Sequence, residues 1–200
     1  MRRLAAALTL LSALPVLGGY LGGLHPMGDS LAVFRAQGAV LLALLSLGAL
    51  VLRAATAGRL GLLLAAVAGL PLLWAYWGPE PAGAGLRLYQ KNMLFRNGDL
   101  AGLEADIRAA SPDVLTLQEV SEPNRALLQA VADVLPHQLG CPFAAVGGPA
   151  VATRLTPVPG RGVCGPGLAA MQVQGPGGPL RLVSVHLHWP WPQGQAAQVA

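Results

Sequence analysis

Charged residues are scarce in this chain. They make up 11% of its 200 residues, against about 25% in an average soluble domain, while apolar residues make up 54%. So few charges exclude an ordinary soluble globule over the whole length and predict a membrane-embedded portion. Residues 1–79 carry five arginines and one aspartate, whereas residues 80–200 carry eight basic and eight acidic residues. The formal net charge of +4 therefore belongs to the apolar half.

The polar half lacks an excess of basic residues. A pI near 9.7 usually raises the question of nucleic-acid binding. Such binding needs a basic face on the domain that meets the phosphates. The arginines of this chain flank apolar segments instead, which is a pattern of membrane topology. We therefore expect no strong electrostatic nucleic-acid signature.

Cysteine is nearly absent, with only Cys141 and Cys164. Neither lies in a Cys-x-x-Cys spacing, which argues against metal ligation by the pair. In the cytosol two isolated thiols would be core filler, but outside the cytoplasm they are a disulfide candidate. Closing the loop between them would stabilise the fold by roughly 3 kcal/mol.

Three long runs lack Asp, Glu, Lys and Arg: residues 4–28, 36–52 and 60–79. At about 1.5 Å per residue, runs of this length suit an apolar bilayer core about 30 Å thick. The sequence predicts three transmembrane helices, at about residues 4–24, 34–52 and 60–78. The first run, which follows two arginines, could instead be a signal peptide, but its length favours a helix.

The arginines predict the orientation of these helices. Arg2, Arg3, Arg53 and Arg59 would lie on the cytoplasmic side, where basic residues concentrate. Residues 80–200 are then extracytoplasmic, and the protein is a multi-pass protein of the cell membrane in contact with the lipid bilayer. Three aromatic residues at the outer end of the third span are typical of a headgroup-level belt: Trp74, Tyr76 and Trp77.

A short linker rich in Pro and Gly, residues 80–85, separates the membrane domain (1–79) from an α/β domain (86–200). Residues 86–92 alternate as a strand should. Asp99 is a plausible N-cap for a short helix with an apolar stripe at Leu100, Leu103 and Ile107. Residues 113–119 form a buried strand, and strand, helix and strand together predict two parallel neighbours.

The rest of the polar half predicts further elements. Residues 121–135 have the apolar spacing of a second helix, and residues 150–154 that of a short strand. Two alternating runs, at residues 168–174 and 180–188, surround a Gly-Pro-Gly-Gly turn and predict an antiparallel hairpin. Residues 195–200 begin another helix.

Two oxygen-bearing side chains end the first two strands. Asn92 follows one strand, and Glu119 ends the other. Carboxylate and amide oxygens suit a hard cation such as Mg²⁺ or Mn²⁺, so the pair is a candidate metal site. A solvated glutamate at a strand end is the plain alternative.

Three blocks resemble the endonuclease/exonuclease/phosphatase superfamily of divalent-metal phosphoesterases: Asn92 after its strand, Leu117-Gln118-Glu119, and His186 at the end of Val183-Ser184-Val185-His186. The resemblance implies a partial four-layer α/β sandwich behind the transmembrane helices. It implies that Glu119 is a direct metal ligand and that Asn92 helps to hold the metal or the phosphate. His186 would donate a hydrogen bond to a phosphate oxygen of a lipid, nucleotide or nucleic-acid substrate. A buried strand histidine is the alternative for His186.

Other residues near these blocks are less specific. His188, two residues after His186, suggests a His-x-His zinc pair, but no third soft ligand is evident. Trp189-Pro190-Trp191-Pro192 resembles the loop after the phosphate-facing histidine in membrane-attached members of that superfamily, or is a rigid aromatic loop without a ligand. Arg154 could contact a phosphate or be a solvated charge.

Two blocks of the superfamily, an Asp-x-Asn and a terminal Asp-His pair, do not occur before Ala200. We therefore expect the chain to be an incomplete phosphoesterase that is inactive by itself. The rival interpretation is a non-catalytic membrane protein whose extracytoplasmic domain binds a partner.

Overall fold

The structure is a computed structural model that describes residues 1–79 and 85–199. These residues form two units, one of residues 1–79 with 188–199 and one of residues 85–187. The predicted linker falls mostly on residues 80–84, outside the described residues, as does Ala200. Residues 188–199 lie with the helices in this grouping, and an α/β domain over residues 86–200 stays a prediction.

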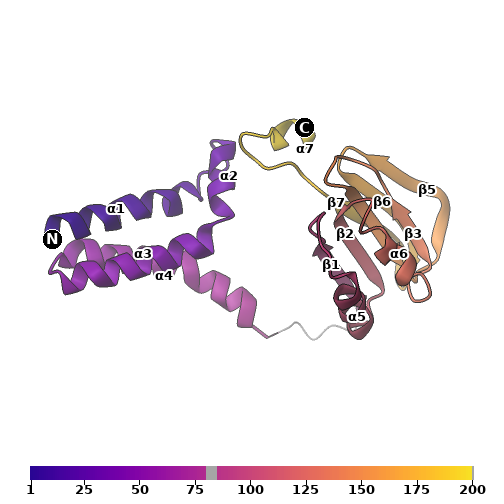
Figure 1. Cartoon of the computed structure of the whole chain (residues 1–200), viewed down its shortest axis with the longest axis horizontal. Helices are drawn as coiled ribbons and strands as arrows, with labels where there is room; N and C mark the ends of the chain where they lie inside the picture. The colour runs from indigo at the N-terminus through magenta and orange to yellow at the C-terminus, as the bar shows by residue number, and fades with distance from the viewer. Residues whose placement is uncertain (80–84, 200) are drawn as a thin grey trace. The chain divides into compact units, whose positions relative to one another are not determined.

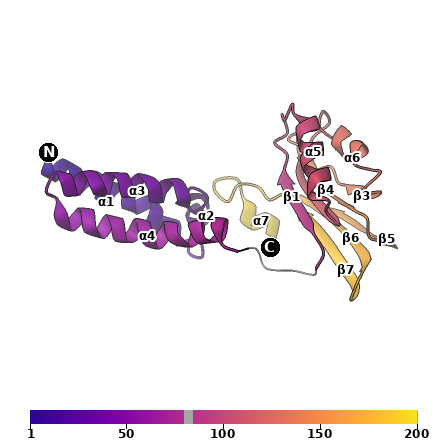
Figure 2. The ribbon, with the colours of Figure 1, turned by 90° about the horizontal axis from the view of Figure 1, so that it is seen from below.

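Three long helices dominate the first unit. They are α1 (Arg2–Gly18), α3 (Arg35–Val51) and α4 (Ala55–Trp77), and they lie side by side in both views (Figures 1 and 2). Two short helices, α2 (Pro26–Ala32) and α7 (Gln195–Val199), complete the unit. The three long helices occur where three spans were predicted, but α1 ends at Gly18 and α4 begins at Ala55.

Of the helices in the described part of the chain, α4 alone is long and apolar enough to cross a membrane by itself. α2 and α3 pass the same test only as a pair, which is bent by 68°. The bend was not predicted. Gly28 of α2 lies against the peptide that joins Leu21 and Gly22, where a Cβ atom would be 2.5 Å from backbone atoms. A side chain at position 28 would therefore clash with this peptide. Three membrane crossings remain a prediction.

The helical unit buries small side chains and exposes large ones. Most residues at the contacts between its long helices are small: Ala5, Thr9, Ala39, Ser46, Ala49, Gly58, Gly61, Ala65 and Ala68. Leucines point outward along the same helices, for example Leu14, Leu44 and Leu63, which are about 62–63% exposed. This distribution is the reverse of that in a water-soluble bundle, whose leucines fill the core.

The second unit contains a four-stranded sheet in the order β1-β2-β4-β3. The strands are β1 (Leu88–Asn92), β2 (Val114–Val120), β4 (Gly148–Thr153) and β3 (His137–Gly140). β1 and β2 are parallel, and the other pairs are antiparallel. Helices α5 (Leu100–Ala110) and α6 (Ala126–Ala130) pack on one face of this sheet through a core that includes Ile107, Leu117 and Leu127.

A second, three-stranded sheet stacks on the other face. It consists of β5 (Pro157–Gly165), β6 (Leu168–Gly175) and β7 (Gly178–Val185), all antiparallel. Val151 of β4 and Ala169 of β6 are fully buried in the contact between the sheets. Cys141 and Cys164 form a disulfide with Cα atoms 5.5 Å apart, which links the end of β3 to β5. The predicted disulfide candidate is therefore present.

The layers differ from the predicted four. Within residues 85–187 both helices cover the four-stranded sheet, so the unit has three layers: helices, sheet and sheet. It is a mixed α/β fold with two sheets, as expected in class. Strand β1, helix α5 and strand β2 confirm the predicted order, and β6 and β7 confirm the predicted hairpin.

The helix predicted over residues 121–135 is wrong in extent. α6 spans only Ala126–Ala130, although Leu127, Val131 and Leu135 are fully buried as the apolar spacing suggested. Strands β3 and β5 were not predicted. β5 contains Pro157, Pro159 and several glycines, which argue against a strand, and it lies at the edge of its sheet with a register shift.

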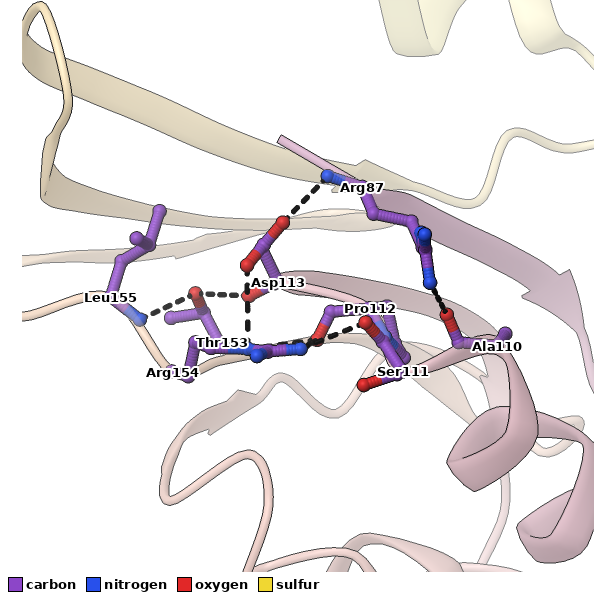
Figure 3. A network of polar contacts seen from close by, with 8 residues as sticks. All are labelled: Arg87, Ala110, Ser111, Pro112, Asp113, Thr153, Arg154 and Leu155. Atoms are coloured by element: carbon purple, nitrogen blue, oxygen red, sulfur yellow. Dashed lines mark hydrogen bonds and ion pairs between the residues drawn. The ribbon is translucent and has the colours of Figure 1, made fainter. Parts of the chain in front are cut away.

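A polar network fixes the start of β2 (Figure 3). Arg154 lies within 3.4 Å of the Asp113 carboxylate and donates hydrogen bonds of 2.8 and 2.6 Å to the carbonyls of Ser111 and Pro112. Asp113 accepts a 2.7 Å hydrogen bond from the N–H of Arg87. The Arg154 side chain stays 45% exposed, and it lies at the end of β2 opposite to Glu119, so it is not placed beside that carboxylate. It has a structural role.

Candidate active site at the ends of β1, β2 and β7

Asn92, Glu119 and His186 come together from three strands. Asn92 is the last residue of β1, Glu119 is the sixth residue of β2, and His186 directly follows β7. Asn92 Nδ2 donates a 2.9 Å hydrogen bond to Oε1 of Glu119. Nε2 of His186 lies 3.7 Å from the same oxygen. The side chains of His186 and Glu119 are 16% and 17% exposed, whereas Asn92 is exposed, so the cluster is open to solvent on the side of Asn92.

A bulge in β2 gives Glu119 its direction. Leu117 pairs with Ala150 and Val120 with Gly148, so two residues of β2 oppose one of β4. Glu119 itself has φ +58°, in the left-handed region that a non-glycine residue rarely occupies. Bulges bend a strand and re-aim a side chain, often beside active sites. Here the bulge interrupts the alternation of β2 and brings the carboxylate to the end of β1.

The turn after β1 receives this carboxylate. The N–H of Phe95 donates a 2.9 Å hydrogen bond to Oε2 of Glu119. The N–H of Leu94 donates a 3.0 Å hydrogen bond to Oδ1 of Asn92, which sets the orientation of the amide. Each oxygen of the carboxylate thus accepts one hydrogen bond, and the amide nitrogen of Asn92, rather than its oxygen, faces Glu119.

Two buried polar residues support the bulge from below. Nδ2 of Asn124 donates a 3.0 Å hydrogen bond to the carbonyl of Glu119, and its Oδ1 accepts a 2.7 Å hydrogen bond from the N–H of Ser121. Oγ of Ser121 donates a 2.8 Å hydrogen bond to the carbonyl of Phe95. These contacts join the backbone of the bulge to the turn after β1, so the two walls of the site are held together.

The cluster can offer one carboxylate to a cation. A carboxylate has about four lone-pair positions, and hydrogen bonds occupy two of those of Glu119. Mg²⁺ keeps several waters and commonly binds through one or two carboxylates together with substrate phosphates. The residues present therefore fit such an ion through Glu119. Among residues 1–79 and 85–199, no group of three or more His, Cys, Asp or Glu side chains is placed to hold a metal ion.

Comparisons with known proteins leave the family open. No family model and no curated protein matches the chain. Two crystal structures of TDP2 from Caenorhabditis elegans, one of a truncated form, are similar, each with a TM-score of 0.43, at 15% and 14% identity. The similar regions cover 55% and 62% of this chain and 49% and 42% of those chains, so the chain spans less than half of their length. Similarity this low identifies neither a family nor an activity.

The predicted zinc pair of His186 and His188 differs from what the structure shows. β7 ends at Val185, and His188 groups with the helical unit, so His186 and His188 do not share a strand face as predicted. The zinc pair has no support from the fold. The ring of Phe143 packs edge-on to His186 with centroids 6.0 Å apart, and this contact was not predicted.

The sequence also failed to reveal the supporting residues. Asn124 lies three residues after Ser121, and its side chain accepts from the Ser121 N–H as in a capping box. That spacing was the available signal. The prediction of a helix over residues 121–135 did not use this pair.

A separate cleft of about 560 Å³ lies between β1 and β2 on one side and β7 on the other. Its polar lining residues are Gln90, Thr116, Gln118 and Arg181. None of the three site residues lines it, so the chemistry proposed below does not use this cleft.

Proposed function

We propose that the α/β unit belongs to a divalent-metal-dependent phosphoesterase, anchored in the membrane by the helical unit. The observation that carries the proposal is the convergence of Asn92, Glu119 and His186 at one point. These are the residues of the three blocks that resemble the endonuclease/exonuclease/phosphatase superfamily. They are far apart in the sequence and come from separate strands.

Each residue has a distinct task in the proposed site. Glu119 would hold Mg²⁺ or Mn²⁺, and such a cation supplies charge neutralisation for the phosphate when bound. Asn92 and the N–H of Phe95 keep the carboxylate in one orientation. His186 lies beside Oε1 of Glu119, the oxygen that Asn92 also contacts. It would donate a proton or a hydrogen bond to a phosphate oxygen. In hydrolysis, water adds to phosphorus, the P–O bond to the leaving alcohol breaks, and the alcohol takes up a proton.

The packing of the helical unit supports the membrane part of the proposal. Helix contacts within bilayers use small residues, because lipid tails solvate leucine as well as protein does. The buried alanines, glycines, serine and threonine of α1, α3 and α4, and their exposed leucines, follow this rule. With the arginine distribution, the α/β unit would be extracytoplasmic, where its disulfide is stable.

Metal binding by the chain in detergent micelles is the direct test. Mn²⁺ titration followed by electron paramagnetic resonance should show one site. Glu119→Gln should weaken it by at least the roughly 10–100-fold that loss of a supporting residue costs. Glu122→Gln is the matched control, because Glu122 is 80% exposed and forms an ion pair with Arg125 at 3.0 Å. Equal Mn²⁺ affinity in the two variants would remove Glu119 from the proposed site.

Hydrolysis separates the enzyme from the rival, a non-catalytic membrane protein with an extracytoplasmic binding domain. The protein made from its complete reading frame should hydrolyse members of a panel of phosphoesters with Mg²⁺, and Glu119→Gln should abolish this activity. Absence of both metal binding and hydrolysis would favour the rival.

A further inference from the structure

The segment that follows His186 docks on the short helix α2. Oγ of Ser30 donates a 3.1 Å hydrogen bond to the carbonyl of Trp191 and accepts a 3.0 Å hydrogen bond from its N–H. Ser30 is 9% exposed, so both hydrogen bonds lie inside the helical unit. The rings of Phe34 and Trp189 lie 6.0 Å apart. These contacts therefore attach the loop of residues 188–192 to α2 and to Phe34, the residue before α3.

The attachment leaves three aromatic rings exposed. Phe34, Trp189 and Trp191 are 55%, 39% and 47% exposed, and we call these three residues the aromatic rim. The backbone of Trp191 is satisfied by Ser30, so the loop does not need its rings to be buried in order to be held. Rings of this kind, held with apolar area outward, suit the headgroup level of a bilayer.

The residues around the aromatic rim are of the kinds found at the boundary of a lipid bilayer. Val40, Leu41, Leu44 and Leu47 of α3 continue from Phe34 with exposures of 61%, 53%, 62% and 50%. The guanidinium of Arg35 lies 4.3 Å from the centre of the Tyr20 ring and donates a 2.8 Å hydrogen bond to the carbonyl of Gly19. A cation and a tyrosine beside an apolar helix are typical of the boundary between hydrocarbon and headgroups.

We propose that the aromatic rim inserts into the interfacial layer of a phospholipid bilayer and anchors the loop of residues 188–192 there. This extends the proposed function and rests on it, because the membrane location of the helices is part of that function. The anchor is distinct from the predicted belt of Trp74, Tyr76 and Trp77, which ends α4.

The anchor limits the distance of His186 from the bilayer surface. Three residue steps separate His186 from Trp189. At no more than about 3.6 Å per residue, their Cα atoms are at most about 11 Å apart. The interfacial layer on one side of a bilayer is about 5–8 Å thick. A phosphoester in a lipid headgroup is therefore within reach of His186, and it is the substrate class that we infer.

Tryptophan depth tests the anchor. The chain contains four tryptophans, so Trp74→Phe with Trp77→Phe leaves only Trp189 and Trp191. In phosphatidylcholine and phosphatidylglycerol vesicles, their emission should be blue-shifted. Lipids brominated near the headgroup should quench it more than lipids brominated near the chain ends. Emission typical of water, with no quenching by either lipid, would overturn the proposal.

Ser30→Ala tests the attachment without touching a ring. It removes both hydrogen bonds to Trp191, so quenching by brominated lipid should fall. Ser12→Ala is the control, since Oγ of Ser12 donates a 2.9 Å hydrogen bond to the carbonyl of Thr9 within α1. Equal quenching in both variants would show that Ser30 does not hold the loop.

Substrate presentation tests the consequence for the site. In the protein from the complete reading frame, Trp189→Ala with Trp191→Ala should lower the ratio of lipid-phosphoester hydrolysis in vesicles to soluble-phosphoester hydrolysis. An unchanged ratio would contradict the lipid substrate class. If neither ester is hydrolysed even by the unmodified protein, the proposed function fails, while the quenching experiment still decides the anchor.

Discussion

Asn124 holds the backbone of Glu119 in place. It is fully buried, and its side chain bridges the carbonyl of Glu119 and the N–H of Ser121 at 3.0 and 2.7 Å. Because Glu119 has a left-handed φ of +58°, its conformation needs such a support. The position of the carboxylate therefore depends on a residue that touches neither oxygen of it.

Asn124→Ala should weaken both the fold and the metal site. The substitution leaves two buried polar groups without their partner, which costs about 1–3 kcal/mol for each. A supporting residue of this kind typically changes metal affinity by about 10–100-fold. Chemical denaturation in micelles measures the first effect, and Mn²⁺ titration measures the second.

Asn97→Ala is the control for that experiment. Oδ1 of Asn97 accepts a 3.0 Å hydrogen bond from the N–H of Asp99, which is exposed and does not hold the backbone of Glu119. It should lower stability slightly and leave Mn²⁺ affinity intact. If Asn124→Ala behaved in the same way, the support would not matter for the site.

Local patterns were enough to predict the elements that carry the site. The alternation in β1, the N-cap at Asp99 and the apolar run of β2 each agree with the final fold, and Asp99 accepts a 2.8 Å hydrogen bond from the N–H of Gly102 as an N-cap should. Parallel neighbours place the ends of β1 and β2 together. That geometry is why Asn92 and Glu119 could be paired from the sequence.

The remaining details depend on tertiary contacts that no local pattern carries. The bulge at Glu119 arises from the pairing of β2 with β4, which lies about thirty residues further on. Apolar spacing predicted a helix over residues 121–135. In the structure the side chain of Asn124 forms hydrogen bonds with the backbone of Ser121 and Glu119, and α6 begins only at Ala126. β5 was missed because prolines are tolerated only at sheet edges, and edges are a property of the fold.

The disulfide should contribute a large share of the stability of the α/β unit. Cys141 and Cys164 are 23 residues apart and join the two sheets. Removing a cross-link over a loop of this length costs about 3 kcal/mol in the chain-entropy model. Cys141→Ala with Cys164→Ala should lower the free energy of unfolding by that amount, measured by denaturation in micelles. Reduction of the unmodified protein should give the same loss, and an unchanged midpoint in both cases would exclude this role.

Tyr89 should titrate abnormally. Burial, together with its hydrogen bond to Asp106 on α5, raises the pKa of Tyr89 to about 12 from its ordinary 10.0. The raised pKa means that the folded state favours the protonated phenol more than the unfolded state does, so protonation of Tyr89 stabilises the fold. This stability is fully present below pH 10 and is lost as the pH rises toward 12.

Titration followed by the ultraviolet absorbance of the phenolate measures this pKa. Subtracting the titration of Tyr89→Phe assigns the signal to Tyr89. Asp106→Asn removes the charge of the acceptor, so the pKa of Tyr89 should fall toward 10. An unchanged titration in Asp106→Asn would assign the whole shift to burial, which is its larger cause.

The stability of the helical unit should depend on side-chain size where its helices contact each other and not elsewhere. A Cβ atom on Gly61 of α4 would lie 2.1 Å from Oγ of Ser46, which is fully buried, so Gly61→Ala forces the helices apart. Overpacking of this kind costs about 1–3 kcal/mol. Gly48→Ala is the matched control, because nothing lies within 4 Å of a Cβ atom there. The control should gain up to about 1 kcal/mol from helix propensity.

Unfolding in micelles followed by circular dichroism compares the two variants. Equal stabilities would mean that α3 and α4 do not pack closely at Gly61, which removes the small-residue interface on which the membrane proposal depends.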